Sequence, residues 1–241
     1  MLLPMTGIVH LATSVMIYFC YLKLNGLYKS MQTKDEALKS LLNFILYINI
    51  FQFLMAAGHF PVLLNEMGLF YYTFNFGYII GHAFLYIAEA YIILVPMYLY
   101  FSEKEYKKYG VGYFRFILLF GLIITVINII NPTNPEIDEK SGLTIFNVPS
   151  VVAGLIPIIT FISVGLSGLL FIAKSAQLQG SAKVKAAILG VGMILIVIGG
   201  PLHELAKNVF EYFLADFLIV VAFFVVMLGI YYEQIILKIK S

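Results

Sequence analysis

Four histidines and one glutamate lie within or at the ends of apolar runs, and their residue types are the ones best suited to chemistry. The histidines are His10, His59, His82 and His203. Glu89 belongs to the apolar run 81–96, and on a helix of about 3.6 residues per turn His82, Tyr86 and Glu89 share one face. An ionised carboxylate that faces lipid is penalised by at least roughly 2.5 kcal/mol. Glu89 should therefore point into a helix bundle or be protonated there.

The topology derived below places all four histidines in the outer half of the membrane. Histidines on different helices at one depth are what a bis-imidazole haem or a multi-histidine metal site requires, because the ligands must converge from separate walls. We predict haem b or a transition metal as the cofactor, with His10, His82 and His203 as its ligands. A metal site would add His59. Hydrogen bonding between helices, or an ordinary place at the interface, is the alternative for each histidine.

A path for protons or ions is the second chemistry that these residues suggest. Intramembrane carboxylates usually mark a proton, ion or ligand path, which gives Glu89 a functional role. The path residues predicted beside it are Tyr86, Asn49, Gln52 and Asp216. No catalytic residue is predicted, because no nucleophile and base stand at a recognisable spacing.

The segment 199–211, GGPLHELAKNVFE, joins the last two apolar runs. Residues 199–201 predict a kink or break that would free backbone carbonyls toward the bundle interior. HELAK begins like the zinc-protease motif HExxH, but Lys207 stands where the second histidine is needed, so we exclude that mechanism. The prediction is a solvated turn in which Lys207 pairs with Glu204 or Glu211.

Composition identifies a polytopic membrane protein. Of the 241 residues, 61% are hydrophobic and only 12% are charged, and the mean hydropathy is +0.95, which no ordinary soluble domain approaches. The net charge of +2 and the scattered basic residues exclude a nucleic-acid-binding patch. A single cysteine, Cys20, excludes an intrachain disulfide and any CxxC motif.

Seven apolar runs are long enough to span about 30 Å of hydrocarbon at 1.5 Å per residue. They lie at residues 5–22, 40–60, 77–100, 112–131, 149–173, 184–203 and 212–232. The first run lacks a basic segment before it and a cleavage site after it, so we expect a retained span and not a signal peptide. The predicted fold is all-α, a single heptahelical transmembrane domain over residues 1–241 without a soluble domain.

The basic residues indicate the orientation. All except Lys140 and Lys207 fall on one side of the predicted topology. They are Lys23, Lys29, Lys34, Lys39, Lys104, Lys107, Lys108, Arg115, Lys174, Lys183, Lys185, Lys238 and Lys240. By the positive-inside rule the N-terminus is predicted outside and the C-terminus in the cytoplasm, in a multi-pass protein of the cell membrane.

Two outer connections are long. Residues 60–76 carry many aromatic residues and no basic one, so we expect a short helix or re-entrant turn in the outer interface. Residues 131–148 are acidic, and Pro132 and Pro135 stop the helix before them. Their length would suit a lid, but the prediction is a plain solvated connector.

Three functions remain open, and none expects a nucleic-acid partner. We prefer a haem- or metal-binding subunit of a membrane redox complex for electron transport, because it alone uses the placement of the histidines. The second is a ligand-sensing receptor module that acts through a cytoplasmic partner, and the third is a proton- or ion-coupled transporter that uses Glu89. A structural or assembly subunit without a ligand is the remaining alternative. Retinal binding as in microbial rhodopsins is excluded, because the run 212–232 has no lysine.

Overall fold

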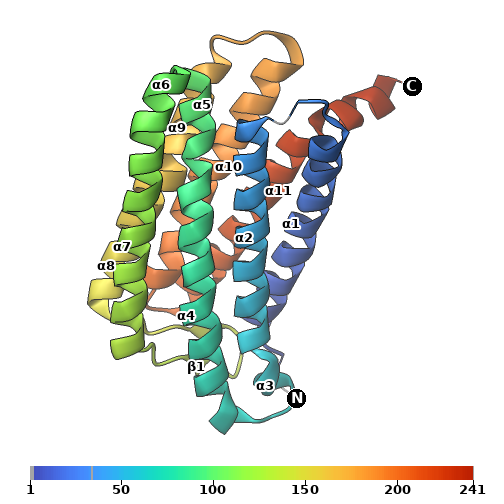
Figure 1. Ribbon diagram of the computed structural model, residues 1–241. Helices are drawn as coiled ribbons and strands as arrows, with labels where there is room; N and C mark the ends of the chain where they lie inside the picture. Colours follow the sequence, from blue (N-terminus) through green and yellow to red (C-terminus); the bar gives the residue numbers. More distant parts are fainter. Residues whose placement is uncertain (1–2, 34, 241) are drawn as a thin grey trace.

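The computed structural model describes residues 3–33 and 35–240 and is 83% helical. Within these residues, seven helical segments are long and apolar enough to cross a membrane, and they form one bundle (Figure 1). The prediction of an all-α membrane protein with seven spans is thereby confirmed. Lys34, one of the residues used to orient the chain, lies outside the described residues.

The elements follow one another along the chain in this order. The first three spans contain α1 (Met5–Ser30), α2 (Glu36–Gly58), α3 (Phe60–Leu63), α4 (Met67–Ile92) and α5 (Leu94–Tyr100). Next come α6 (Glu103–Glu105), the π-helical turn η1 (Tyr106–Gly110), α7 (Val111–Ile130) and the strands β1 (Glu136–Ile137) and β2 (Thr144–Ile145). The last three spans contain α8 (Ser150–Thr160), the π-helical turn η2 (Phe161–Gly165), α9 (Leu166–Ser175), α10 (Gly180–Leu205) and α11 (Val209–Lys240).

The helices continue beyond the apolar runs that predict them. α1 runs to Ser30 through the polar residues after its apolar run, and α4 begins at Met67, so the aromatic residues 67–76, expected in a short helix or re-entrant turn, form its first turns. Local capping sets some of these ends. The Asp35 side chain accepts a hydrogen bond from the backbone N–H of Leu38 (2.8 Å) and so begins α2.

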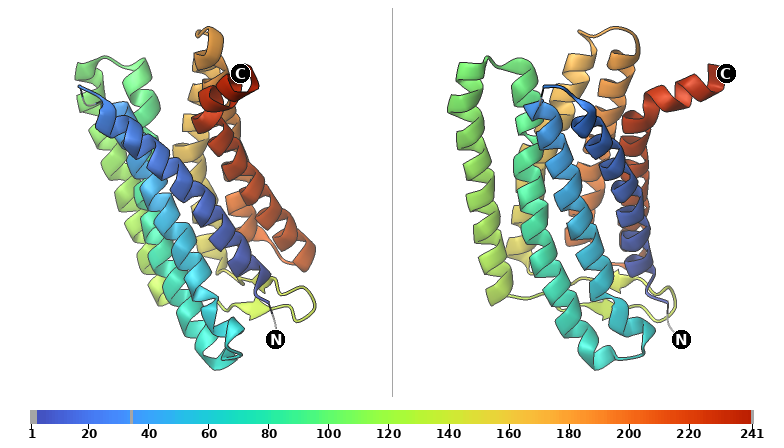
Figure 2. Two further views of the ribbon diagram at one scale, coloured as in Figure 1. Left: turned by 90° about the vertical axis from the view of Figure 1, so that its right-hand side faces the viewer. Right: turned by 45° about the vertical axis from the view of Figure 1, so that its right-hand side comes forward.

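The bundle has two ends, which we call the N face and the C face. The N face carries the N-terminus, α3 and the two strands, and the C face carries the C-terminus, α6 and the connection between α9 and α10 (Figure 1). Neighbouring spans run in opposite directions, so residues from the start of α1 and α4 meet residues from the ends of α2 and α10. Figure 2 shows this arrangement from two further sides.

The helices approach one another closely where glycine allows it. α4 packs extensively on α2, and α11 packs on α10. A Cβ atom added at Gly77 of α4 would lie 2.5 Å from the backbone carbonyl oxygen of Leu54 in α2. No side chain fits at that distance, so glycine at this position is what lets the two backbones meet.

The connection between α7 and α8 differs from its prediction. β1 and β2 pair as a short antiparallel hairpin, which lies across the N face (Figure 1). Leu143, Thr144 and Phe146 are buried there, at no more than 6% exposed. The prediction of a plain solvated connector is wrong, because these side chains find their partners among the helices.

Candidate functional site

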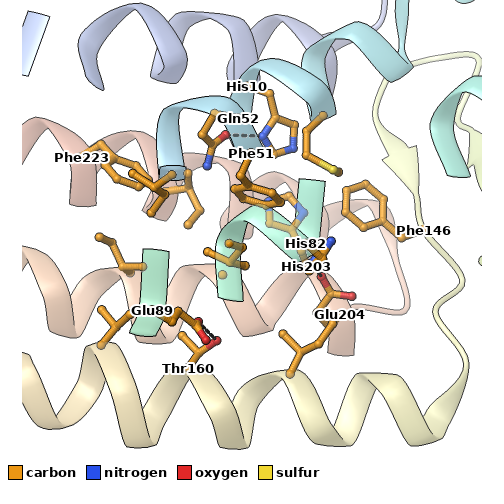
Figure 3. A pocket seen from close by; sticks show the side chains of 18 residues that line it. His10, Phe51, Gln52, His82, Glu89, Phe146, Thr160, His203, Glu204 and Phe223 are labelled. Atoms are coloured by element: carbon orange, nitrogen blue, oxygen red, sulfur yellow. Dashed lines mark hydrogen bonds and ion pairs between the residues drawn. The ribbon is translucent and has the colours of Figure 1, made fainter. Parts of the chain in front are cut away.

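An internal cavity of about 50 Å³ lies between the helices and extends from the N-face half of the bundle toward its middle (Figure 3). Its polar lining consists of His10, Gln52, His82, Glu89, Thr160, His203 and Glu204. Each of these residues is at most 7% exposed. Because one water occupies roughly 10–15 Å³ of such a volume, the cavity has room for about three to five water molecules.

His82 and Glu204 form the first acid–base pair of the site. His82 Nε2 lies 3.3 Å from Glu204 Oε1, and the hydroxyl of Tyr78 donates a hydrogen bond to the other carboxyl oxygen. His82 Nδ1 lies 2.8 Å from the carbonyl oxygen of Tyr78. A carbonyl only accepts, so Nδ1 carries a hydrogen and Nε2 is the nitrogen that faces the carboxyl group. The pair can therefore hold one proton between Nε2 and Oε1.

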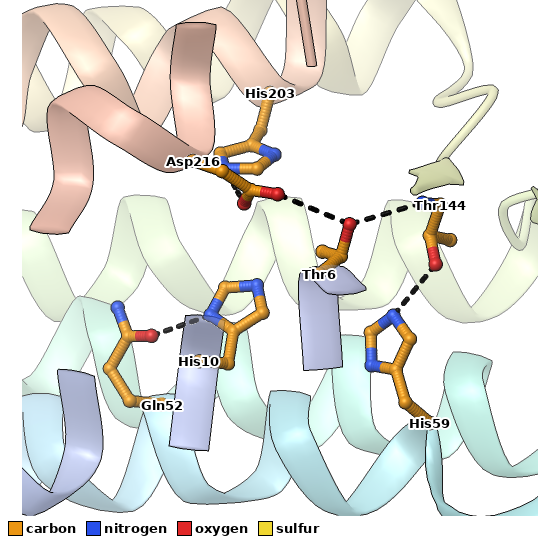
Figure 4. A network of polar contacts seen from close by, with 7 residues as sticks. All are labelled: Thr6, His10, Gln52, His59, Thr144, His203 and Asp216. Carbon is orange, nitrogen blue, oxygen red and sulfur yellow. Dashed lines mark hydrogen bonds and ion pairs between the residues drawn. The ribbon is translucent and has the colours of Figure 1, made fainter. Parts of the chain in front are cut away.

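His203 and Asp216 form the second pair (Figure 4). His203 Nε2 lies 3.2 Å from Asp216 Oδ1, but the two groups are not aligned for a hydrogen bond, and among the described residues neither atom has another partner. The other oxygen of Asp216 accepts a hydrogen bond from the hydroxyl of Thr6 (3.2 Å). This pair is thus in electrostatic contact while its facing atoms keep their hydrogen-bonding capacity.

His59 has a different environment from the other histidines. Its Nδ1 lies 2.7 Å from the carbonyl oxygen of Met55, so Nδ1 carries a hydrogen, and its Nε2 lies 2.9 Å from the hydroxyl of Thr144. The backbone N–H of Thr144 in turn donates to Thr6 Oγ1 (3.0 Å). Both ring nitrogens are occupied, which gives His59 the character of a structural residue between α2 and the hairpin.

His10 lies between the other imidazoles. Its Nδ1 is 2.5 Å from Gln52 Oε1, and its ring centroid is 5.9 Å from that of His203 and 6.3 Å from that of His59. His10 Nε2 is buried and has no hydrogen-bond partner in the part of the chain that the structure describes. This nitrogen is available to a ligand or a water molecule.

Glu89 lies about 10 Å nearer the C face than His82, seven residues further along α4. It is 0% exposed, and its Oε1 accepts a hydrogen bond from the hydroxyl of Thr160 (2.7 Å). Its Oε2 lies near Ser163 without an aligned hydrogen bond to any described residue. Ser163 belongs to η2, and π-helical turns of this kind are frequent at functional sites.

The predicted residues divide into those that line the cavity and those that do not. His10, His82 and His203 line it together with Gln52 and Glu89.

The other four predicted residues do not line the cavity, and His59 is the one of them that bonds to Met55 and Thr144. Asp216 contacts the cavity through His203. Tyr86 is buried but lines no part of the cavity, and Asn49 accepts a hydrogen bond from Ser14 (2.9 Å) at a partly buried position away from it. The structure therefore brings five of the nine predicted residues together around the cavity and leaves His59, Tyr86, Asn49 and Asp216 outside its lining.

Glu204 is the important residue that sequence reasoning misplaced. α10 passes through Pro201 and ends at Leu205, so Glu204 lies on the helix and faces the bundle, where it is 7% exposed. α10 does not break at residues 199–201, and the solvated turn lies after Glu204, at residues 206–208, where the backbone N–H of Lys207 donates a hydrogen bond to Glu211 (2.6 Å). A sequence signal was present, since Gly200, His203 and Glu204 are spaced i, i+3, i+4 on one helical face.

Three features of the structure bear on the predicted haem or metal cofactor. Among residues 3–33 and 35–240, no group of three or more His, Cys, Asp or Glu side chains is arranged to hold a metal ion. Two of the four predicted ligands, His59 and His82, already use both ring nitrogens. A haem macrocycle is also far larger than a cavity of about 50 Å³. Haem or metal binding stays a prediction.

Fold and site together define a multi-pass membrane helical bundle with buried histidine and carboxyl side chains around a small cavity. No protein-family model matches the chain, and no curated protein is measurably similar to it in sequence.

Proposed function

We propose that this protein translocates protons across the membrane, and that Glu89 and the two histidine–carboxylate pairs bind and exchange these protons through the cavity. The observation that carries the proposal is that one cavity is lined by Glu89 at one end and by His82, His203 and Glu204 at the other. Intramembrane carboxylates that face a bundle interior commonly mark such paths.

The hydrogen-bonding state of the lining supports a water-filled path. The facing atoms of His10, His203, Asp216 and Glu89 lack aligned partners among the described residues. A buried polar atom left unsatisfied costs about 1–3 kcal/mol. Three to five water molecules in the cavity would supply those partners and would connect Glu89 with the histidines, since protons pass readily along hydrogen-bonded water.

The helices beside Glu89 support proton translocation over a fixed structural role. α8 contains Pro157 and continues into the π-helical turn η2, which packs against α4 and α10. A proline and a π-turn each interrupt the regular hydrogen-bond ladder of a helix. The span made of α8, η2 and α9 lines the cavity through Thr160 and Val164 and contains both interruptions. It is therefore the span that we expect to change shape when Glu89 becomes exposed to the C face.

Proton flux into proteoliposomes tests the proposal. A pH-sensitive dye inside the vesicles would report proton movement driven by a pH gradient, with a potassium ionophore to compensate charge. We expect flux in the wild type, its loss in Glu89→Gln, and full flux in Glu136→Gln, whose carboxylate is exposed on the N face. Equal flux in Glu89→Gln and the wild type, or none in either, would contradict the proposal.

A metal ion bound by His10 and His203 is the second candidate function. It is favoured by the 5.9 Å separation of their rings and by three unpartnered ring nitrogens, His10 Nε2 and both nitrogens of His203. The absorption spectrum and the metal content of the purified protein test it. A haem band or stoichiometric metal that disappears in His10→Gln would support this candidate, and the absence of both would eliminate it.

A further inference from the structure

The hairpin between α7 and α8 supplies one wall of the cavity. Every other residue of the lining belongs to a helix, whereas Phe146 follows β2 in the irregular segment before α8. Its ring is 2% exposed and stacks on His203, with centroids 5.2 Å apart and an interplanar angle of 15°. Phe146 thus lies on the N-face side of the polar lining, between that lining and the outside of the bundle (Figure 3).

Hydrogen bonds to several helices hold the hairpin in place. Its Thr144 contacts Thr6 of α1 and His59 of α2 through the bonds described above. The backbone N–H of Phe146 donates to the hydroxyl of Tyr212 in α11 (2.9 Å). The backbone N–H of Met5 donates to the carbonyl oxygen of Gly142 (2.9 Å). Phe146, Ile137 and Ile145 also pack in the apolar cluster of the N-face half, so displacement of the hairpin has to break these buried bonds and contacts together.

The backbone beside Phe146 has the character of a hinge. Asn147 adopts a left-handed conformation with φ of 50°, which residues other than glycine rarely occupy. The strands on the other side are only two residues long, so little regular structure resists displacement of the hairpin. A segment held by few ladder hydrogen bonds can open locally without unfolding of the whole bundle.

We propose that the β1–β2 hairpin is a lid on the cavity and that Phe146 is its plug. With the hairpin docked, the ring of Phe146 separates His203 from water at the N face. When the hairpin swings away about Asn147, water reaches the cavity and protons exchange with the histidine–carboxylate pairs. The lid rests on the proposed function only in the statement that protons are what passes through the opened cavity.

Cysteine accessibility tests the lid directly. Met55 lines the cavity and is 1% exposed, so Met55→Cys places a reporter thiol there, while the natural Cys20 is buried in another part of the bundle and gives the background. We would measure the modification rate by a water-soluble thiosulfonate reagent in detergent. With Met55→Cys alone, slow modification is expected. Adding Phe146→Ala should accelerate it at least about tenfold, because the docked lid loses a large buried ring.

Two further variants keep the test specific. Phe70→Ala removes an equally buried ring (2% exposed) from the same N-face apolar cluster, but Phe70 does not line the cavity, so no acceleration is expected. Gly142→Ala should accelerate modification from outside the cavity. Gly142 has φ of +71°, and an added Cβ would lie 2.0 Å from the carbonyl oxygen of Leu3, so the docked hairpin cannot accommodate it.

The outcomes separate the lid from the proposed function. Fast modification with Met55→Cys alone, or equal acceleration by Phe70→Ala and Phe146→Ala, would overturn the lid. If Phe146→Ala does not fold, Gly142→Ala decides, and unchanged accessibility in that variant overturns the lid. Gated accessibility in a protein that shows no proton flux would retain the lid and reject proton transport. If Glu89→Gln loses proton flux but the modification rate of Met55→Cys does not depend on Phe146 or Gly142, proton transport is retained and the lid is rejected.

Discussion

The two halves of the bundle bury very different side chains. The N-face half holds all four histidines, Glu204, Asp216 and the hairpin, and its polar atoms face one another across the cavity. The interior toward the C face is an apolar cluster built from residues such as Leu24, Phe44 and Ile45. Glu89 and Thr160 lie where the two regions meet.

This difference shows where the fold tolerates the cost of buried polarity. An unpaired charge in the membrane interior costs several kcal/mol, so a bundle that needed only stability would resemble its C-face half throughout. In the N-face half the polar groups lie in pairs, which offsets much of that cost. Among the described residues, the unpartnered atoms of His10, His203 and Glu89 line the cavity, whereas those of Thr13, Tyr86 and Asn128 lie outside its lining.

The largest effect is expected from a carboxylate placed in the apolar half. Ile45 and Gln52 lie two turns apart on the same face of α2, and both are at most 2% exposed. Ile45→Glu should lower the free energy of unfolding by about 3 kcal/mol or more, because its carboxyl group has only apolar neighbours. Thermal unfolding in detergent measures the loss.

Gln52→Glu is the matched control for that variant. It keeps an oxygen that can accept from His10 Nδ1, so its stability should stay within about 1 kcal/mol of the wild type. Equal destabilisation by the two substitutions would mean that the halves do not differ in their tolerance of charge.

A smaller effect is expected from Glu204→Ala. The substitution leaves the Tyr78 hydroxyl and His82 Nε2 without their partner, which should cost about 2–4 kcal/mol of unfolding free energy. Glu204→Gln retains an acceptor for Tyr78 and should cost roughly half as much. If Glu204→Ala has the same free energy of unfolding as the wild type, the His82–Glu204 pair does not stabilise the N-face half.

The sequence predicted the spans well, because hydropathy is a local property that α-helices in a membrane must satisfy. The sequence also predicted that His10, His82 and Glu89 face the interior of the bundle, since helical spacing fixes which residues share a face. The side of the membrane on which each face lies stays a prediction from the basic residues.

The hairpin could not be predicted in the same way. Its polar residues look solvated in the sequence, and their partners are distant in the chain: Thr144 bonds to Thr6, 138 residues away, and to His59, 85 residues away. Glu204 was misplaced for a related reason. Whether a proline ends a helix or is tolerated within it depends on packing by other helices, and α11 packs closely on α10 there.

The smallest effect concerns the hairpin turn. Hydrogen bonds from the side chain (2.6 Å) and backbone N–H (2.8 Å) of Ser141 hold the pKa of Asp138 below its ordinary value of 3.8. A carboxyl group whose folded-state pKa is lowered stabilises the fold above its unfolded-state pKa. This contribution to the turn is therefore present above pH 3.8 and is lost as the pH falls through the lower folded-state value.

Hydrogen exchange at the Gly142 amide, which donates to the Asp138 carbonyl oxygen (2.8 Å), measures that loss. Its protection should fall in this acid range in the wild type and show no such step in Asp138→Asn. A step of the same size in both proteins would assign the change to another group.

Proton binding by Glu89 can be observed without a substrate by infrared difference spectroscopy across a pH titration. The wild type and Glu136→Gln should both show a carbonyl band of a buried carboxylic acid that changes with pH, and Glu89→Gln should lack it. An identical carboxylic-acid band in Glu89→Gln and the wild type would contradict the account, because the proton would then be bound elsewhere.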